Sequence, residues 1–133
     1  MNGECIFCRI VKGTIPSTTI YEDEDTLAFL DIHPANKAHC LVIPKGHYAT
    51  FNDIPTMILQ HIIAVTQKVA RAIDRSMHAD GYNILMNNHP AAGQVVAHAH
   101  FHIVPRYAQD AVRIELGETT FKDVSEEIKT SLE

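Results

Sequence analysis

Apolar residues recur at helical spacing in one long stretch near the middle of the chain. They are Ile58, Ile62, Val65, Val69 and Ile73. Steps of three and four positions put these side chains on one face, which predicts an amphipathic helix of about twenty residues. We expect Asn52 or Asp53, just before Pro55, to cap its first turn, because both residue types accept hydrogen bonds from free backbone N–H groups.

The remaining apolar residues fall in short blocks of the kind that form β-strands. The predicted strands are residues 19–21, 26–31, 38–44, 82–86 and 95–105. Residues 6–12 predict one or two helical turns, which Gly13 ends and Pro16 keeps from continuing. We therefore expect an α+β fold, in which an antiparallel sheet of about five strands packs on one long helix.

The C-terminal part of the chain is more polar than the rest. From residue 108 onward only Val124, Ile128 and Leu132 stand at helical spacing, which predicts an edge strand or a marginal terminal helix. A length of 133 residues suits one domain. We expect a single domain over residues 1–133, with its motifs in residues 5–107 and an extension over residues 108–133.

The charge balance is acidic. Lys and Arg number 11 and Asp and Glu 16, so the formal net charge is −5 with neutral histidines. No stretch clusters Lys and Arg, which argues against long nucleic acid as a partner, because non-specific affinity comes from neutralising phosphates. A small anionic ligand stays open, since backbone N–H groups and imidazoles bind one phosphate without a basic surface.

Two features of the sequence bear on the cellular compartment. No apolar run approaches the roughly eighteen residues of a membrane span, and residues 1–4 carry no basic region ahead of an apolar stretch. Three cysteines cannot close a disulfide framework, and Cys5 and Cys8 have C-x-x-C spacing. We expect a protein of a reducing compartment, the cytoplasm, in which this pair has a metal or redox role.

Histidine is the unusual residue of this composition, with nine in the chain and three of them within five positions. His98, His100 and His102 alternate with apolar residues, so in a strand their rings share one face. A polar outer face is one interpretation, although histidine offers no packing advantage there over Thr, Lys or Glu. A second is a tri-histidine metal site. His98 and His102 would stand about 13 Å apart along a strand, too far for one zinc ion with bonds of about 2.0 Å.

The third interpretation makes His100 a nucleophile. A neutral imidazole dominates near pH 7 because its usual pKa is about 6.5, and its phosphoryl adduct is reactive enough to be hydrolysed. The loop over residues 87–94 contains Asn, Gly and Gln, which could offer amides and backbone N–H groups to phosphate oxygens.

The run from Gly93 to Arg106 resembles the signature of the histidine triad nucleotide-binding proteins, in which three histidines alternate with apolar residues. The resemblance extends to residues 5–10, 27–32 and 39–47. These motifs follow one another in the family's order and cover about residues 5–107. The resemblance implies the fold of that family and an activity on nucleotides.

The resemblance implies a role for each histidine of the cluster. His100 would attack the α-phosphorus of a nucleotide and carry a covalent nucleotidyl group, while His102 would contact the phosphate and help the leaving group. His39 would lie behind the nucleophile and orient it, and the backbone carbonyl of His98 would receive its other ring proton.

The resemblance also implies the residues that hold the nucleotide. Asp31 would accept both ribose hydroxyls, and the amides of Asn87 and Gln94 would hold the phosphate and ribose side. The apolar slot for the base would consist of Ile6, Phe7, Ile10, Phe29 and Ile32. Val95 and Val96 would border the phosphate, where Val95 keeps its backbone N–H contact but offers no side-chain contact.

Metal binding is implied for a second group of residues. Relatives with the C-x-x-C motif hold zinc with both cysteines, a further histidine and the first histidine of the triad, which here are Cys5, Cys8, His47 and His98. Four protein ligands leave no open position, so such a zinc would be structural. The alternative for the two cysteines is a pair of small buried thiols.

The sequence therefore predicts a nucleotidyl hydrolase or transferase that acts on a purine nucleotide with a substituent on its α-phosphate. The leaving group could be an amine, as in a nucleoside phosphoramidate, or a nucleotide, as in a dinucleoside polyphosphate. A non-catalytic nucleotide-binding module and a zinc-dependent protein-binding module remain as alternatives. The resemblance also implies a homodimer, and a sheet with an apolar edge could extend across a two-fold axis.

Overall fold

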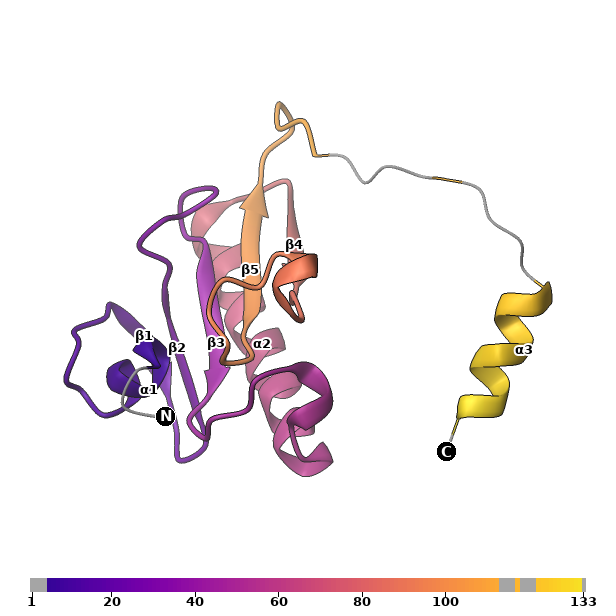
Figure 1. Ribbon diagram of the computed structural model, residues 1–133. Coiled ribbons are helices and arrows are strands. Elements are labelled where there is room, and N and C mark those ends of the chain that lie inside the picture. The colour runs from indigo at the N-terminus through magenta and orange to yellow at the C-terminus, as the bar shows by residue number, and fades with distance from the viewer. Residues whose placement is uncertain (1–4, 113–116, 118–121, 133) are drawn as a thin grey trace.

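The structure is a computed structural model that describes residues 5–112, 117 and 122–132. Its centre is an antiparallel sheet with the strand order β1-β2-β3-β5-β4 (Figure 1). The strands are β1 (Thr19–Glu22), β2 (Thr26–Leu30), β3 (Cys40–Pro44), β4 (Gly81–Leu85) and β5 (Phe101–Arg106). The α+β fold and the five-stranded sheet predicted from the sequence are confirmed.

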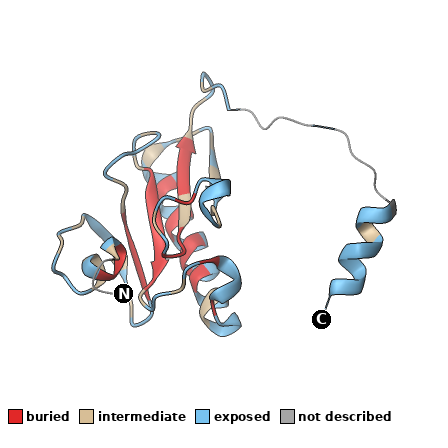
Figure 2. Ribbon diagram, in the orientation of Figure 1, coloured by how far each residue is buried: buried red, intermediate tan, exposed pale blue. Residues whose placement is uncertain are grey.

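The long helix α2 (Thr56–Met77) covers one face of the sheet. The apolar stripe of α2 packs on inward-facing residues of the strands, and this core is buried (Figure 2). It includes Ala28, Cys40, Val42, Ile62, Val65, Val69, Ile73 and Ile103. Within the described residues no helix is both long and apolar enough to cross a membrane.

The short helix α1 (Ile6–Val11) packs on the other face of the sheet. Its Phe7 joins a second buried cluster with Phe29, Leu41 and Ile43. Successive strand residues point to opposite faces, so β2 and β3 each supply one set of side chains to α2 and the other set to α1. The sheet therefore carries a large core on one face and a smaller apolar layer on the other.

Asp53 does not cap α2 as the sequence suggested. Its Oδ2 accepts hydrogen bonds from the backbone N–H and the hydroxyl of Thr50, at 3.0 and 2.8 Å. These bonds stabilise a separate 3₁₀ turn, η2 (Phe51–Asp53), and α2 begins three residues later. Pro55 takes the N-cap position of α2, where its carbonyl accepts from the backbone N–H of Leu59 at 2.9 Å.

β5 is shorter than predicted, because it begins at Phe101 instead of at residue 95. Its ladder with β3 ends at the pair of Val42 with Phe101. Pro44 has no N–H to donate, and its carbonyl accepts from the ring of His98 at 2.8 Å instead. Residues 95–100 therefore form a loop, and His98 and His100 lie outside the strand.

An edge strand or a terminal helix was predicted for the C-terminal segment, and the structure has the helix. Helix α3 (Lys122–Ser131) stands away from the sheet and from α2 (Figure 1). The predicted extension also includes residues 113–116, 118–121 and 133, which lie outside the described residues, as do residues 1–4 at the other end.

Candidate functional site

Two clusters of histidine lie side by side on the α1 face of the sheet, and the first includes both cysteines of the C-x-x-C motif. The Sγ atoms of Cys5 and Cys8 lie 3.4 and 3.5 Å from Nδ1 of His98. The Sγ atom of Cys8 also lies 3.3 Å from Nδ1 of His47. The four ligand atoms lie within 4.8 Å of one another, which is compact enough to surround a single metal ion.

A hydrogen bond fixes the tautomer in which the ring of His98 could bind a metal ion. Its Nε2 lies 2.8 Å from the carbonyl oxygen of Pro44, which can only accept. Nε2 therefore carries the proton, and Nδ1 presents a lone pair to the two sulfurs. A ring whose second nitrogen donates to a backbone carbonyl is the usual arrangement around a metal-bound histidine.

Burial keeps Cys8 and His98 neutral without a metal. It raises the pKa of the Cys8 thiol to about 11, with a smaller contribution from the hydrogen bond with Cys5. It lowers the pKa of His98 to about 4. A set of two thiols and two imidazoles fits tetrahedral zinc, which binds thiolates and neutral imidazoles, and zinc binding would release the thiol protons.

A cavity of about 470 Å³ lies next to the cysteines and histidines, under α1 and over β2 and β3. Such a volume lies within the range of small-ligand sites. Its walls include most of the residues predicted to hold a nucleotide. They are Ile6, Phe7, Ile10, Phe29, Asp31, Ile32, His39, Asn87, Val95, Val96, His100 and His102.

His100 is buried in one wall of the cavity with its tautomer fixed. Its Nδ1 lies 2.7 Å from the carbonyl oxygen of His98, so Nδ1 carries the proton and Nε2 keeps a lone pair. The ring of Phe7 packs edge-on against it, with centroids 5.0 Å apart. Burial lowers the pKa of His100, which favours the neutral ring that a nucleophile requires.

His39 and His102 form a hydrogen-bonded chain whose direction can be assigned. The backbone N–H of Ala35 donates to Nδ1 of His39 at 2.9 Å, so Nε2 of the neutral ring carries the proton. That Nε2 lies 2.9 Å from Nδ1 of His102, which must accept. Nε2 of His102 is then a donor, and it is buried without a hydrogen-bond partner among the described residues. The chain therefore leaves the N–H of His102 as a buried donor without a partner among the described residues.

The ring of His39 contacts that of His102, with centroids 5.2 Å apart. Burial lowers the pKa of His39, although the carboxylate of Asp31, 3.5 Å away, acts in the opposite direction. Burial also lowers the pKa of His102 to about 4. Both rings are therefore neutral at pH 7.

Asp31 stands at the end of β2 with its carboxylate at the cavity. Its Oδ1 accepts from the backbone N–H of His33 at 2.9 Å, and its Oδ2 faces His39. Each oxygen of a carboxylate keeps a further lone pair, so both can still accept from a ligand hydroxyl.

Gln94 does not line the cavity as the sequence suggested. Its Nε2 donates to the carbonyl oxygen of Ala49 and its Oε1 accepts from the backbone N–H of His89, both at 2.7 Å. The side chain thus fixes the loop before His98. The adjacent Gly93 lines the cavity, and its φ of 95° is one that residues with a Cβ rarely adopt.

Sequence reasoning missed several residues of the cavity wall. Ile15, Pro16, Ser17, Leu30, His33 and Leu41 also line it. Ile15, Pro16 and Ser17 belong to the loop after α1 and carry no periodic signal. Gly93, by contrast, belongs to the loop that the sequence already indicated as a source of backbone N–H groups.

The chain is similar to known proteins over most of its length. The sequence model of one family, the HIT domain, matches residues 12–109. An adenosine 5'-monophosphoramidase of Candida albicans is 42% identical, with 79% of this chain and 72% of that protein covered. A crystal structure of a Streptococcus mutans protein has a TM-score of 0.90 at 43% identity, with 98% of this chain and 86% of that chain covered. The crystal structure of a zinc-bound histidine triad family protein from Mycobacterium smegmatis has a TM-score of 0.79 at 42% identity, and the match covers 90% of this chain and 86% of that one.

Proposed function

The chain belongs to the HIT domain family, and on that premise we propose that it is a nucleotidyl hydrolase or transferase that acts on the α-phosphorus of a purine nucleotide. The observation that carries the proposal is the orientation of His100. Its Nδ1 donates to the carbonyl of His98 at 2.7 Å, so the lone pair of Nε2 is available at a nucleotide-sized cavity. The name of the Candida albicans relative supports a phosphoramidate as substrate.

The first step forms a bond between Nε2 of His100 and the α-phosphorus. The bond from phosphorus to the leaving group breaks, and its electron pair goes with the leaving group. The product is a nucleotidyl-histidine. Its ring proton stays on Nδ1, which remains hydrogen-bonded to the carbonyl oxygen of His98. In the second step a water oxygen attacks the same phosphorus and gives up a proton to solvent, the N–P bond breaks with its electron pair returning to Nε2 of His100, and the nucleoside monophosphate leaves. An acceptor other than water would make the reaction a transfer.

His102 is placed to donate a hydrogen bond to the substrate phosphate or its leaving group. The hydrogen-bonded chain from Ala35 through His39 leaves Nε2–H of His102 as its free donor. The rings of His100 and His102 lie 4.8 Å apart, so one substrate phosphate can contact both. An amine leaving group must be protonated before it leaves, because an amide anion is too basic to leave; this proton comes from solvent, and the N–H of His102 orients the group with a hydrogen bond.

The rest of the cavity suits the remaining parts of a nucleotide. Asp31 would accept the ribose hydroxyls, and Ile6, Phe7 and Phe29 would enclose the base among apolar side chains. Asn87 and the backbone around Gly93 would hold the phosphate.

Turnover assays with adenosine phosphoramidate and with diadenosine tetraphosphate test this function. We expect hydrolysis of the phosphoramidate. The ratio of the two rates of hydrolysis shows whether an amine or a nucleotide is the preferred leaving group. Absence of turnover of either compound, together with tight binding of AMP, would favour a non-catalytic nucleotide-binding module instead.

We infer that zinc is held by Cys5, Cys8, His47 and His98. The donor types, the lone pair of His98 and its bond to Pro44 fit that ion, and a solved relative is zinc-bound. The metal would supply structural stabilisation only. By fixing the ring of His98, the site would also fix the carbonyl that orients His100.

We also infer a homodimer that forms along the edge of β4. Among the described residues this strand pairs with β5 alone, and its Tyr82, Ile84 and Leu85 are 48%, 45% and 38% exposed. An apolar edge strand is prone to pair with another chain, and a two-fold axis allows each β4 to pair with its copy.

A further inference from the structure

The loop between β2 and β3 fixes the ring of His39 through a tight turn. The backbone N–H of His39 donates to the carbonyl oxygen of Asn36 at 3.1 Å, and that of Ala35 donates to Nδ1 of the same ring at 2.9 Å. Ala38, inside this turn, has a φ of 70°, a conformation that residues with a Cβ adopt only at a cost in free energy. The turn is therefore strained, and contacts from outside the loop must hold its shape.

The side chain of Asn36 supplies such contacts. Its Nδ2 donates to the carbonyl oxygen of Pro105 at 3.0 Å and to Oδ2 of Asp110 at 2.9 Å. An amide nitrogen carries two N–H groups, so one side chain can make both bonds. Pro105 belongs to β5, the strand that also contains His102. Asn36 therefore ties the loop that fixes His39 to the strand of its hydrogen-bond partner.

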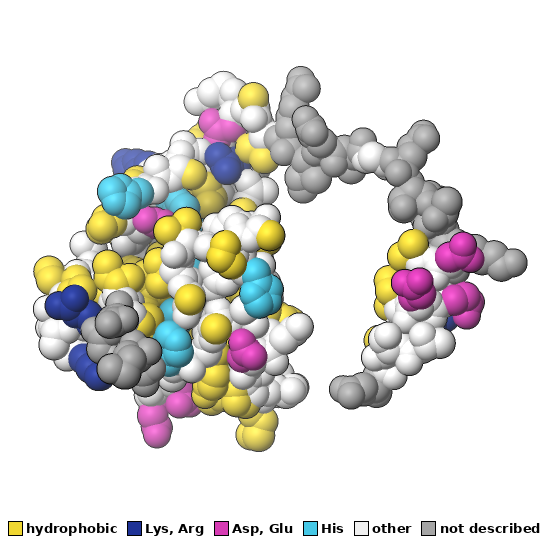
Figure 3. Space-filling view, in the orientation of Figure 1, with side chains coloured by type: hydrophobic (Ala, Val, Ile, Leu, Met, Phe, Trp, Pro, Cys, Tyr) yellow, Lys and Arg dark blue, Asp and Glu magenta, His cyan; other side chains and the backbone are white. Residues whose placement is uncertain are grey.

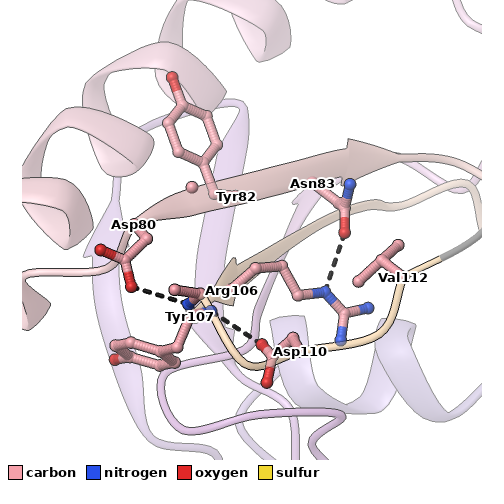
Figure 4. Close-up of a pocket in the computed structure, with 9 residues that line it drawn as sticks. Asp80, Tyr82, Asn83, Arg106, Tyr107, Asp110 and Val112 are labelled. Atoms are coloured by element: carbon pink, nitrogen blue, oxygen red, sulfur yellow. Dashed lines mark hydrogen bonds between the residues drawn. The ribbon is translucent and has the colours of Figure 1, made fainter.

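Asp110 is itself held in place by a turn after β5. Its Oδ2 also accepts from the backbone N–H of Tyr107 at 2.8 Å (Figure 4), and its own backbone N–H donates to the carbonyl oxygen of Tyr107 at 2.8 Å. The next residue, Ala108, donates its backbone N–H to Oδ2 of Asp80 at 2.8 Å. Asp110 is therefore a fixed acceptor for the amide of Asn36.

The anchor lies at the boundary with solvent. Asn36 and Asp110 are both partly exposed. Figure 3 shows acidic and basic side chains next to each other on the surface near the end of β5. Because water competes for hydrogen bonds at such a place, loss of the anchor should shift the loop between two arrangements and leave the fold intact.

The position of this loop decides the direction of the hydrogen bonds between the histidines. With the N–H of Ala35 in place, Nδ1 of His39 accepts, Nε2 of His39 donates to Nδ1 of His102, and Nε2 of His102 carries a proton. If the N–H of Ala35 withdrew, the proton of each ring could move from Nε2 to Nδ1. Nδ1 of His102 would then donate to His39, and its Nε2 would turn a lone pair, which repels a phosphate oxygen, toward the substrate.

We propose that Asn36 is a positioning residue of the active site, which through its bonds to Pro105 and Asp110 holds the loop that keeps His102 in the Nε2-protonated tautomer. This inference rests on the proposed function, because the N–H of His102 serves the substrate only in that reaction. Asn36 lies outside the described wall of the cavity, so it acts through the loop and not on the nucleotide.

Asn36→Ala in the full-length protein tests the position of the proton. The two ring nitrogens of ¹⁵N-labelled histidine differ in chemical shift according to which one is protonated, and comparison with His102→Asn identifies the signals of His102. We expect protonated Nε2 in the wild type, and a fraction of this tautomer at least threefold lower in Asn36→Ala. The kcat/KM for adenosine phosphoramidate should fall by the same factor, since only one tautomer is competent.

Three further variants separate the anchor from a general loss of structure. Asn83→Ala is the matched control, because its side chain accepts from Nε of Arg106 at 2.9 Å at the same end of the sheet (Figure 4), and it should change both quantities less than twofold. Asp110→Ala removes one of the two bonds and should give a smaller shift in the same direction. Ala38→Gly relieves the strain of the turn, so in combination with Asn36→Ala it should restore most of the wild-type tautomer.

The outcomes distinguish this inference from the proposed function. An unchanged tautomer of His102 in Asn36→Ala would overturn the inference, as would a lower Nε2-protonated fraction with unchanged kcat/KM. Equal shifts in Asn83→Ala and Asn36→Ala would also overturn it. A wild type that does not hydrolyse the phosphoramidate would refute the proposed function, and the spectra would then decide alone whether Asn36 sets the tautomer.

Discussion

Replacement of Cys8 by serine tests the inferred zinc site through the stability of the whole protein. Cys8 is 6% exposed and contacts both histidines of the group. Serine keeps the size of the side chain but supplies no thiolate, so Cys8→Ser leaves at most three ligands. Metal that binds only the folded chain stabilises it by about 4 kcal/mol when free zinc is a thousandfold above the dissociation constant.

The corresponding shift in melting temperature follows from the chain length. Unfolding entropy of about 2.1 cal/mol/K per residue gives roughly 0.28 kcal/mol/K for 133 residues. A loss of about 4 kcal/mol therefore lowers Tm by roughly 14 °C. Without metal the thiol of Cys8 and the ring of His98 are neutral at pH 7, so no buried charge adds to this loss.

The assay is thermal unfolding with and without a chelator, together with the zinc content of the purified protein. We expect about one zinc per chain and a chelator-induced fall in Tm for the wild type, and neither for Cys8→Ser. Cys40→Ala is the matched control, because Cys40 is buried in the α2 core away from the site. It should lose some stability but keep its zinc and its response to the chelator. A chelator effect of equal size in Cys8→Ser, or none in the wild type, would refute the site.

Three further predictions concern the nucleotide cavity and acid stability. Asp31→Asn should weaken AMP binding about tenfold or more in calorimetry, because it removes charge-assisted bonds to the ribose hydroxyls, and unchanged affinity would contradict that role. Burial lowers the pKa of His100 and lowers that of His102 to about 4, so both rings stay neutral as the pH falls. The apparent pKa of the acidic limb of the kcat/KM profile should therefore lie below the usual histidine value of about 6.5. An apparent pKa above 7 would refute this. Burial would raise the pKa of Asp23, but hydrogen bonds from His61, the Asp25 backbone and Tyr21 outweigh it and hold the pKa at about 2. The resulting stability is present above pH 4 and lost as pH falls through about 2, so Asp23→Asn should cost about 2 kcal/mol in urea unfolding at pH 7 and little at pH 2.

The parts of the fold that could be predicted from the sequence are those with a repeating pattern. The stripe of α2 and the apolar blocks of β2 and β3 gave their elements to within a few residues, because one buried face fixes the period of each. The start of β5 could not be predicted this way. The alternation of residues 98–102 continues through the loop, and only the contact of His98 with Pro44 shows that the ladder has ended.

The candidate site likewise has a part that the sequence pattern predicts and a part that it does not. The residue types of both clusters could be predicted, and the spacing of His98 and His102 already argued against one shared metal ion. The structure places His98 with the cysteines and His102 with His39. Which ring contacts which depends on the distance between β2, β3 and the loop before β5, and no local pattern encodes that distance. The position of the Gln94 side chain likewise depends on its hydrogen bond to the carbonyl oxygen of Ala49, which is 45 residues away in the sequence.

The central claim is that His100 forms a covalent bond to the nucleotide, and mass spectrometry of the enzyme during turnover tests it most directly. The protein is mixed with adenosine phosphoramidate, unfolded within milliseconds at neutral pH, digested and analysed for a peptide that carries one added adenylyl group. The account predicts that fragmentation places this group on His100, and that His100→Ala gives no adduct while it still binds AMP. An adduct on any other residue, or a His100→Ala variant that keeps more than about a hundredth of the wild-type kcat, would contradict it.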